Sequence, residues 1–321
     1  MSKHTGHWPP YHLLEENLEA RAEAKLERLE RLYHLGQNAA WDGRKLLAEL
    51  IAKHGPPVLP EAQRASALKL LSILLWGELA AWAISADLAE RIDDIEAKMA
   101  ATSQAHDEAR HFYVLRDYLR ALGHPVPHLG GFGRRVLLGI LETENLAHKL
   151  IGMQLLTESN ALSIFRSLAD AKIEPVLCEL LPYYERDESR HVGLGVLYLP
   201  RLLQRMSRTE ALGAMAFQLR CIWLLIQGGM SMREDFAALG IDQREMAAHT
   251  VRLQDQIMKE MLGAAGRGKG RLQGLINPQR GVGPRVFDFL HPPQGKDAPA
   301  WHLATLSLWS RGAKVVDRFL A

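Results

Sequence analysis

Apolar residues recur along most of this chain at the three- and four-residue spacing of helices, and no segment alternates convincingly with the period of two that marks strands. Ala, Leu, Glu, Arg and Lys, which favour helices, dominate the composition. The pattern predicts helical regions at 11–34, 43–54, 61–122, 134–206, 209–238, 242–263 and 301–320. The fold class is therefore all-α, and the two longest regions are expected to be helical hairpins.

Glycine and proline mark the ends of these regions. Gly and Pro residues at 55–57 end the second helix, and a segment rich in both at 123–133 is expected to cross between the hairpins. The hairpin tips are expected near 93–94 and at 170–175. Residues 264–300 hold many Gly, Pro, Lys and Arg residues, which predicts a long irregular segment.

These boundaries predict four parts of the chain. Residues 1–60 would form N-terminal helices that pack on a bundle, and residues 61–206 would form the bundle itself. Residues 207–263 would add helices to the same domain, and residues 264–321 would form an irregular basic arm and a C-terminal helix.

Composition and charge narrow the function classes. Apolar residues make up 47% of the 321 residues, enough for a sizeable core, and 39 basic against 37 acidic residues give a net charge of +2. This balance offers no global electrostatic case for nucleic acid or an anionic membrane. Cys178 and Cys221 form no Cys-x-x-Cys motif, and the polar start of the chain has no apolar leader, so we expect a reducing, cytoplasmic setting.

One apolar stretch, Leu70 to Ala86, imitates a membrane span but contains Glu78. Because a carboxylate is costly in lipid, a buried helix is the better interpretation, and we expect no membrane span.

The two hairpins resemble each other when the sequence is shifted by 80 residues. Glu78 then aligns with Glu158, and the motif Asp-Glu-x-Arg-His at 107–111 aligns with the same motif at 187–191. The matches concentrate on ionisable residues. This repetition is far more specific than one Glu-x-x-His pair, which many helices carry by chance.

The spacing predicts that these residues converge. In each motif the Glu and His are three positions apart, so both lie on one face of a helix. Glu78 precedes Glu108 by 30 residues, which lets a helix run out and return to the same height at a rise of about 1.5 Å per residue. The arrangement matches the plan of a dinuclear carboxylate site in a bundle core. The candidate metal ligands are Glu78, Glu108, His111, Glu158, Glu188 and His191.

The residue types explain the chemistry. Four carboxylates balance two divalent cations, and oxygen and imidazole ligands suit iron or manganese. Buried without metal, these acids would be costly, and their apolar flanks imply burial. Asp107 and Asp187 are placed to accept the other N–H of a ligand His, each from the opposite motif, and Arg110 and Arg190 would balance these acids.

On these motifs the chain resembles the ferritin-like superfamily of dinuclear iron carboxylate proteins. DEARH and DESRH are most similar to its oxygen-activating branch, which includes the ribonucleotide reductase small subunit and the related ligand-binding oxidases. The resemblance covers about 66–206 and implies a ferritin-like four-helix bundle, here with extra N- and C-terminal helices. It implies the same six metal ligands, and as cofactors two iron ions or one manganese and one iron.

The sequence departs from this branch at two places. Leu115 stands where the reductase small subunit keeps a radical Tyr, so a tyrosyl radical of that type is not expected. Ala161 and Leu162 stand where many monooxygenases and desaturases have a Thr.

The expected function is a non-haem dinuclear iron oxidase or monooxygenase that activates dioxygen to oxidise a largely apolar organic substrate. A monooxygenase would need an electron-donor protein for repeated turnover, and a homodimer is one open oligomeric state. The candidates for lining a substrate pocket are Trp82, Gln154, Tyr184 and Gly195, with core packing the simpler interpretation of Tyr184.

Two alternatives stay open. The first is an iron-handling or peroxide-scavenging ferritin-like protein without an organic substrate, which predicts no cavity beside the metals. The second is a scaffold with a redox-silent metal, whose added helices bind a partner.

Overall fold

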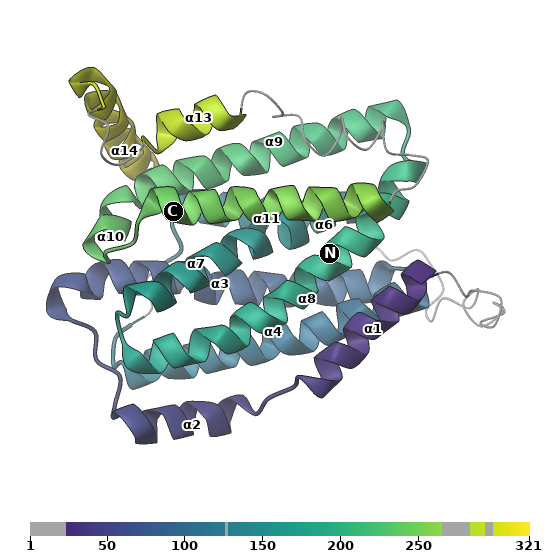
Figure 1. The fold of residues 1–321 in the computed structure, drawn as a ribbon, viewed down its shortest axis with the longest axis horizontal. Helices are drawn as coiled ribbons and strands as arrows, with labels where there is room; N and C mark the ends of the chain where they lie inside the picture. The colour runs from purple at the N-terminus through teal and green to yellow at the C-terminus, as the bar shows by residue number, and fades with distance from the viewer. Residues whose placement is uncertain (1–23, 126–127, 265–282, 293–297) are drawn as a thin grey trace.

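The computed structural model describes residues 24–125, 128–264, 283–292 and 298–321, and every regular element in these residues is a helix (Figure 1). The helices are α1 (Ala24–Asn38), α2 (Gly43–His54), α3 (Glu61–Arg91), α4 (Ile95–Ala121), α5 (Gly131–Glu142), α6 (Leu146–Leu150), η3 (Ile151–Thr157, a π-helix), α7 (Glu158–Ala171), α8 (Pro175–Arg205), α9 (Arg208–Ser231), α10 (Arg233–Ala238), α11 (Gln243–Ala264), α13 (Gly283–Leu290) and α14 (Ala300–Leu320). The predicted all-α class is confirmed.

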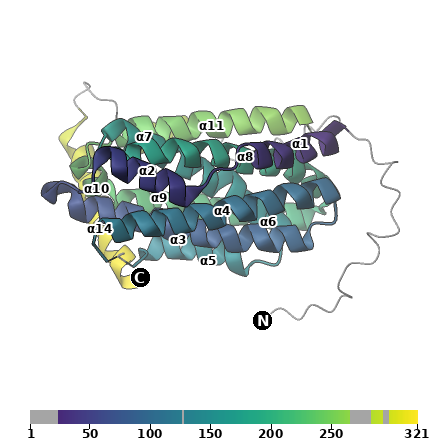
Figure 2. The same cartoon turned by 90° about the horizontal axis from the view of Figure 1, so that it is seen from below.

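The centre of the molecule is a bundle of α3, α4, α8 and the continuous stretch α6–η3–α7 (Figure 1). α3 and α4 pack along each other as one hairpin, and α7 and α8 pack as the second. α1 and α2 lie against α4 and α8, α11 covers α7 and α8, and α9 covers α5 and η3. α14 crosses α9 and α5 at one end of the bundle, as seen from below in Figure 2. The division of the chain at residues 60, 206 and 263 stays a prediction.

The structure corrects three details of the predicted helices. The predicted helix that begins the second hairpin is interrupted at 143–145, where the Asn145 side chain accepts hydrogen bonds from Ala147 N and His148 N and starts a new helix. The predicted helix at 209–238 is divided at Met232. The segment expected to be irregular contains α13. Residues 11–23 of the first predicted helix, and 265–282 and 293–297 of the predicted arm, lie outside the described residues.

The apolar core consists of two main clusters separated by a polar layer. Along α3, one cluster ends at Leu75 and the other begins at Ala80. Along α4 and α8 the same change of cluster occurs between Ala101 and Val114 and between Tyr184 and Val192. Three helices therefore place their polar interruption at the same depth of the bundle, as the 30-residue spacing predicted.

Two of the described helices, α3 and α9, are long and apolar enough to cross a membrane by length and composition. This is weak evidence, because core helices of soluble proteins meet the same criterion. The most apolar window of α3 is 56% buried, and this helix runs through the bundle beside α4, as expected for the stretch that carries Glu78. The corresponding window of α9 is only 22% buried.

Candidate dinuclear metal centre

Six side chains from four helical segments meet in the polar layer. Glu78 comes from α3, Glu158 begins α7, and α4 and α8 each supply one Glu-x-x-His pair. All six are buried, and the most exposed of them is Glu78, at 5%. Their ligand atoms form two groups in which every atom lies within 4.8 Å of the others. The groups are Glu78, Glu108, His111 and Glu188, and Glu108, Glu158, Glu188 and His191.

The two groups share Glu108 and Glu188, so these carboxylates lie between the two imidazoles. Oε1 of Glu188 is 3.1 Å from Nδ1 of His111, and Oε2 of Glu188 is 2.7 Å from Nδ1 of His191. Oε1 of Glu108 is 3.0 Å from Nδ1 of His191, and Oε2 of Glu78 is 3.2 Å from Nδ1 of His111. Both imidazoles therefore present Nδ1 to the carboxylates, and the cluster can hold two metal ions.

The donor atoms fit such a pair of ions. Oε2 of Glu108 is buried and has no hydrogen-bond partner among the described residues. An ionised carboxylate oxygen in an apolar core is stable only beside a cation or a hydrogen-bond donor. Four carboxylates and two imidazoles match the preference of divalent iron and manganese for oxygen and nitrogen ligands.

The pKa shifts show how the cluster balances its charge without metal. Burial raises the pKa of Glu78 and of Glu158 well above the usual range, and in Glu158 the charges of Glu188 and Glu108 add to this effect. Burial also opposes ionisation of Glu108, but the neighbouring imidazoles outweigh it and lower its pKa. The carboxylates raise the pKa of both His111 and His191 despite their burial. These directions favour protons on the outer carboxylates and on the imidazoles when metal is not bound.

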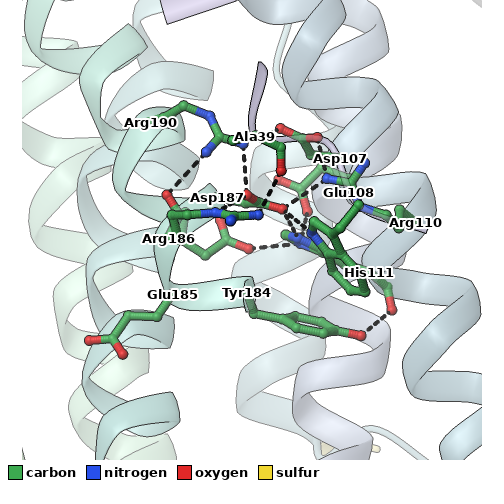
Figure 3. A network of polar contacts seen from close by, with 12 residues as sticks. Ala39, Asp107, Glu108, Arg110, His111, Tyr184, Glu185, Arg186, Asp187 and Arg190 are labelled. Atoms are coloured by element: carbon green, nitrogen blue, oxygen red, sulfur yellow. Dashed lines mark hydrogen bonds and ion pairs between the residues drawn. The ribbon is translucent and has the colours of Figure 1, made fainter. Parts of the chain in front are cut away.

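A ring of two acids and two arginines surrounds the His side of the centre (Figure 3). The Arg110 guanidinium lies 2.5 Å from Oδ1 of Asp107 and 2.8 Å from Oδ2 of Asp187. Arg190 closes the ring at 3.0 Å from Asp107 and 2.8 Å from Asp187. The sequence predicted these four residues around the centre. Burial opposes ionisation of the two acids, but the hydrogen bonds and charges of the opposite imidazoles, together with the arginines, outweigh it and lower the pKa of each.

Trp41 also contacts this ring, and no sequence pattern indicated its role. Its indole Nε1–H donates a hydrogen bond of 2.8 Å to Oδ2 of Asp187, and the Arg110 guanidinium lies 4.9 Å from the ring centroid. Trp41 precedes α2 and has no counterpart in the repeat, so only the fold brings it to the site.

Gln104 is a second residue that sequence reasoning missed. Its Nε2 donates to Oε1 of Glu108 and to Oε1 of Glu158, each at 3.2 Å, and its own carbonyl accepts from Gln154 Nε2 at 3.2 Å. The sequence did contain a signal, because Gln104 lies one turn before Glu108, the position that Tyr184 occupies in the other motif.

The four residues that the sequence predicted to line a substrate pocket have other neighbours in the structure. Gln154 belongs to the amide chain just described, and Gly195 permits its close approach, since a Cβ at Gly195 would lie 2.7 Å from Gln154 Cβ. Tyr184 stacks on His111 with centroids 4.3 Å apart and donates a hydrogen bond to the His111 carbonyl. Trp82 is 40% exposed and lies against Phe112.

A cavity of about 80 Å³ adjoins the opposite side of the centre, and none of these four residues lines it. Among the described residues, Glu78 and Glu158 are the only charged ones that line it, and its apolar walls come from α3, α5, η3, α7 and α9. Gly77 also lines it, and a Cβ at that position would meet no atom within 4 Å.

The comparisons with known proteins agree with this architecture. No family model matches the chain, and no curated protein does. A solved structure of a valine variant of an R2-like ligand-binding oxidase, with an aerobically reconstituted Mn/Fe cofactor, is similar at a TM-score of 0.50 and 14% identity, over 97% of this chain and 98% of that one. A second structure of an R2-like ligand-binding oxidase, after photoconversion, is similar at a TM-score of 0.48 and 13% identity, over 98% and 99% of the two chains.

At this identity the likeness concerns the fold, and it extends over nearly the whole chain rather than the repeated hairpins alone. The chain has the ferritin-like fold that its two motifs implied.

Proposed function

We propose that this protein is a dinuclear metal oxidase that uses dioxygen to oxidise a small apolar organic molecule. The observation that carries the proposal is the cavity of about 80 Å³ that adjoins Glu78 and Glu158. A centre that only stored iron or removed peroxide would need no apolar cavity beside its metals, so the cavity favours an enzyme with an organic substrate.

The two ligand groups define which residues would hold each ion. Glu78 and His111 would bind only one ion, and Glu158 and His191 would bind only the other. Glu108 and Glu188 would bind both. The donor set suits two iron ions or one manganese and one iron. When bound, such a pair supplies the redox chemistry that reduces dioxygen and oxidises the substrate.

The chain's own residues give this centre two different sides. On the His side, Asp107 and Asp187 accept from Nε2 of the imidazoles and leave Nδ1 turned toward the carboxylates, where it would bind an ion. On the other side, Glu78 and Glu158 line the cavity and would stand between it and the bound ions. A molecule in the cavity would therefore approach the centre past these two carboxylates.

The cavity lining defines the substrate class. Besides the two carboxylates, its polar side chains are those of Thr157 and Asn160, and the Thr157 hydroxyl already donates to the Gly152 carbonyl. No basic side chain in the part of the chain that the structure describes lines the cavity. A charged substrate would lose its hydration without gaining a partner, so an uncharged, largely apolar molecule is the better fit.

Filling the cavity tests the proposal. Gly77→Val places a side chain in open space, and Gly139→Val is a matched control, because Gly139 also lies in a helix with nothing within 4 Å and does not line the cavity. Iron-loaded, anaerobically reduced protein would be mixed with dioxygen and a panel of small alkenes and aromatic hydrocarbons. Products would be identified by mass spectrometry.

The wild type and Gly139→Val should yield an oxidised organic product. Gly77→Val should bind two metals yet lose at least about tenfold of the product, the scale of about 1.4 kcal/mol in transition-state stabilisation. Product formation that is equal in Gly77→Val and the wild type would remove the cavity from the function. Oxygen consumption without any organic product would favour the iron-handling alternative.

A further inference from the structure

The exposed apolar side chains of this protein are concentrated on two adjoining helices. Among the described residues, nine of the fifteen exposed large apolar side chains belong to α9 and α14. They are Leu212, Leu219, Trp223, Trp301, Leu303, Leu308, Val315, Val316 and Phe319. Single exposed apolar residues need no explanation, but a concentration of this kind marks an interaction surface.

On each helix the spacing places most of these residues on one face. In α14, Trp301, Leu308 and Val315 recur every seven residues, and Phe319, at 91% exposed, follows one turn later. The opposite face of α14 is buried against the bundle at Leu306 and Ala313. The exposed stripe of α14 therefore has no partner in the part of the chain that the structure describes.

The apolar stripe of α9 adjoins α14. Leu212, Leu219 and Trp223 share its outer face, and the Trp223 ring lies 6.2 Å from the Trp309 ring of α14. Figure 1 shows α14 crossing the end of α9, and the two helices pack on each other. We call the exposed residues of both helices the α9/α14 face.

The charges of the α9/α14 face have one predominant sign. Exposed arginines lie at positions 208, 220, 311 and 318, and within the described ranges none of them lies in an ion pair, although Glu234 of α10, which pairs with Lys314, acts on Arg311 through its charge. The acids on these helices are otherwise engaged. Glu210 caps the start of α9, and Asp317 is buried and accepts from the Phe132 backbone N–H. Apolar and aromatic side chains beside unpaired arginines are typical of helices that lie on an anionic lipid surface.

We propose that the α9/α14 face docks on the surface of an anionic lipid bilayer. Trp301, Leu308 and Phe319 would enter the boundary between headgroups and acyl chains, while Arg311 and Arg318 would contact lipid phosphates. Basic residues near such a surface are attracted to the lipid phosphates, and burial of the aromatic and aliphatic side chains adds to this attraction. The net charge of +2 for the whole chain gives no sign of this local group of arginines.

The charge pattern favours a bilayer over a second copy of the chain. In a twofold-symmetric dimer built on this face, the same arginines would oppose one another across the interface. α9 also lies on the surface rather than spanning it, because its inner residues Ala214, Gln218 and Cys221 are buried against the bundle. An anionic surface satisfies both the apolar stripe and the arginines.

Vesicle sedimentation of the full-length, metal-loaded protein tests this proposal. The wild type should sediment with vesicles of equal parts phosphatidylcholine and phosphatidylglycerol, far less with phosphatidylcholine alone, and less in high salt. The double variant Leu308→Glu/Phe319→Glu and the double variant Arg311→Glu/Arg318→Glu should each lose at least about tenfold of the bound fraction, or 1.4 kcal/mol. Val58→Glu, at a 71% exposed position before α3, is the control and should bind normally.

Metal content and circular dichroism would show that the variants are folded, and neither depends on the proposed oxidase activity. Binding to the anionic vesicles that is unchanged in both double variants would overturn the proposal. Equal binding to neutral vesicles would also overturn it. A wild-type dimer that ignores vesicles and is split by Leu308→Glu/Phe319→Glu would instead assign the face to a second copy.

Discussion

The Nε2 atom of His111 lies 3.2 Å from Oδ2 of Asp187, an acid that belongs to the opposite copy of the repeated motif. The relationship is reciprocal, because Nε2 of His191 lies 3.4 Å from Oδ2 of Asp107. α4 and α8 therefore each orient the imidazole of the other helix. A ligand His whose second nitrogen is held in this way has a fixed tautomer and a more basic metal-facing nitrogen.

Asp187→Asn should weaken metal binding at the site that contains His111. An amide can keep a hydrogen bond to His111 but no longer balances Arg110 and Arg190, and it disturbs the acceptor of Trp41 Nε1. Loss of such a partner typically lowers metal affinity by about 10- to 100-fold. Competition titration with a chelator would measure both affinities, and Asp107→Asn should weaken the site of His191 instead. Unchanged affinities in both variants would remove the two acids from this role.

Substitution of a carboxylate that belongs to both ligand groups should lower the number of bound metals more than substitution of a carboxylate that belongs to one group. Glu78→Ala removes a ligand from one group and leaves the other group intact, so one metal per chain should remain. Glu158→Ala should also retain one metal, at the other position. Glu108→Ala removes a ligand from both groups and should reduce loading at both. Elemental analysis after iron loading gives the numbers, with the exposed Glu142→Ala as a control that keeps two. Two metals retained in Glu108→Ala would contradict the assignment of shared ligands.

The convergence of the site was predictable because the sequence carries it twice. Helical periodicity gave α2 and the outline of both hairpins, and the repeated interval from Glu78 to Glu108 set the depth at which they meet. The break at 143–145 was less visible, since it depends on one capping side chain, Asn145, inside an otherwise helical pattern.

The surroundings of the site were harder to predict than its ligands. Gly195 does not line the cavity, because a missing side chain can equally bring two helices together, as it does with Gln154. The cavity instead lies beside Gly77. The space next to Gly77 is free because of the way in which α5 and α9 cover α3 and α7. Contacts such as that of Trp41 depend on tertiary placement and leave no local pattern.

Gln104 should position two carboxylates of the centre. Gln104→Leu keeps a side chain of similar size but removes the donor shared by Glu108 and Glu158. Both carboxylates would be less restrained, and we expect about tenfold weaker metal binding, at the low end for outer partners of metal ligands. An altered absorption spectrum of the cobalt-loaded protein would report the changed geometry. Gln154→Leu, which removes the partner of Gln104 without touching a carboxylate, should have a smaller effect. Equal effects of the two substitutions would indicate a packing defect instead.

Removal of metal should lower the thermal stability of the protein, because the buried carboxylates then balance their charge only through protons and imidazoles. Each site stabilises the folded state by about 2.7 kcal/mol when free metal is present at about 100 times its dissociation constant. In a chain of this size each kcal/mol is expected to raise the melting temperature by roughly 2 °C or somewhat more. Differential scanning calorimetry with and without a chelator would measure the shift. Glu108→Ala supplies the control, since it lacks a ligand of both groups and its melting temperature should respond little to metal. A wild-type melting temperature that is indifferent to metal would mean that these six side chains form a proton-balanced core rather than a metal centre.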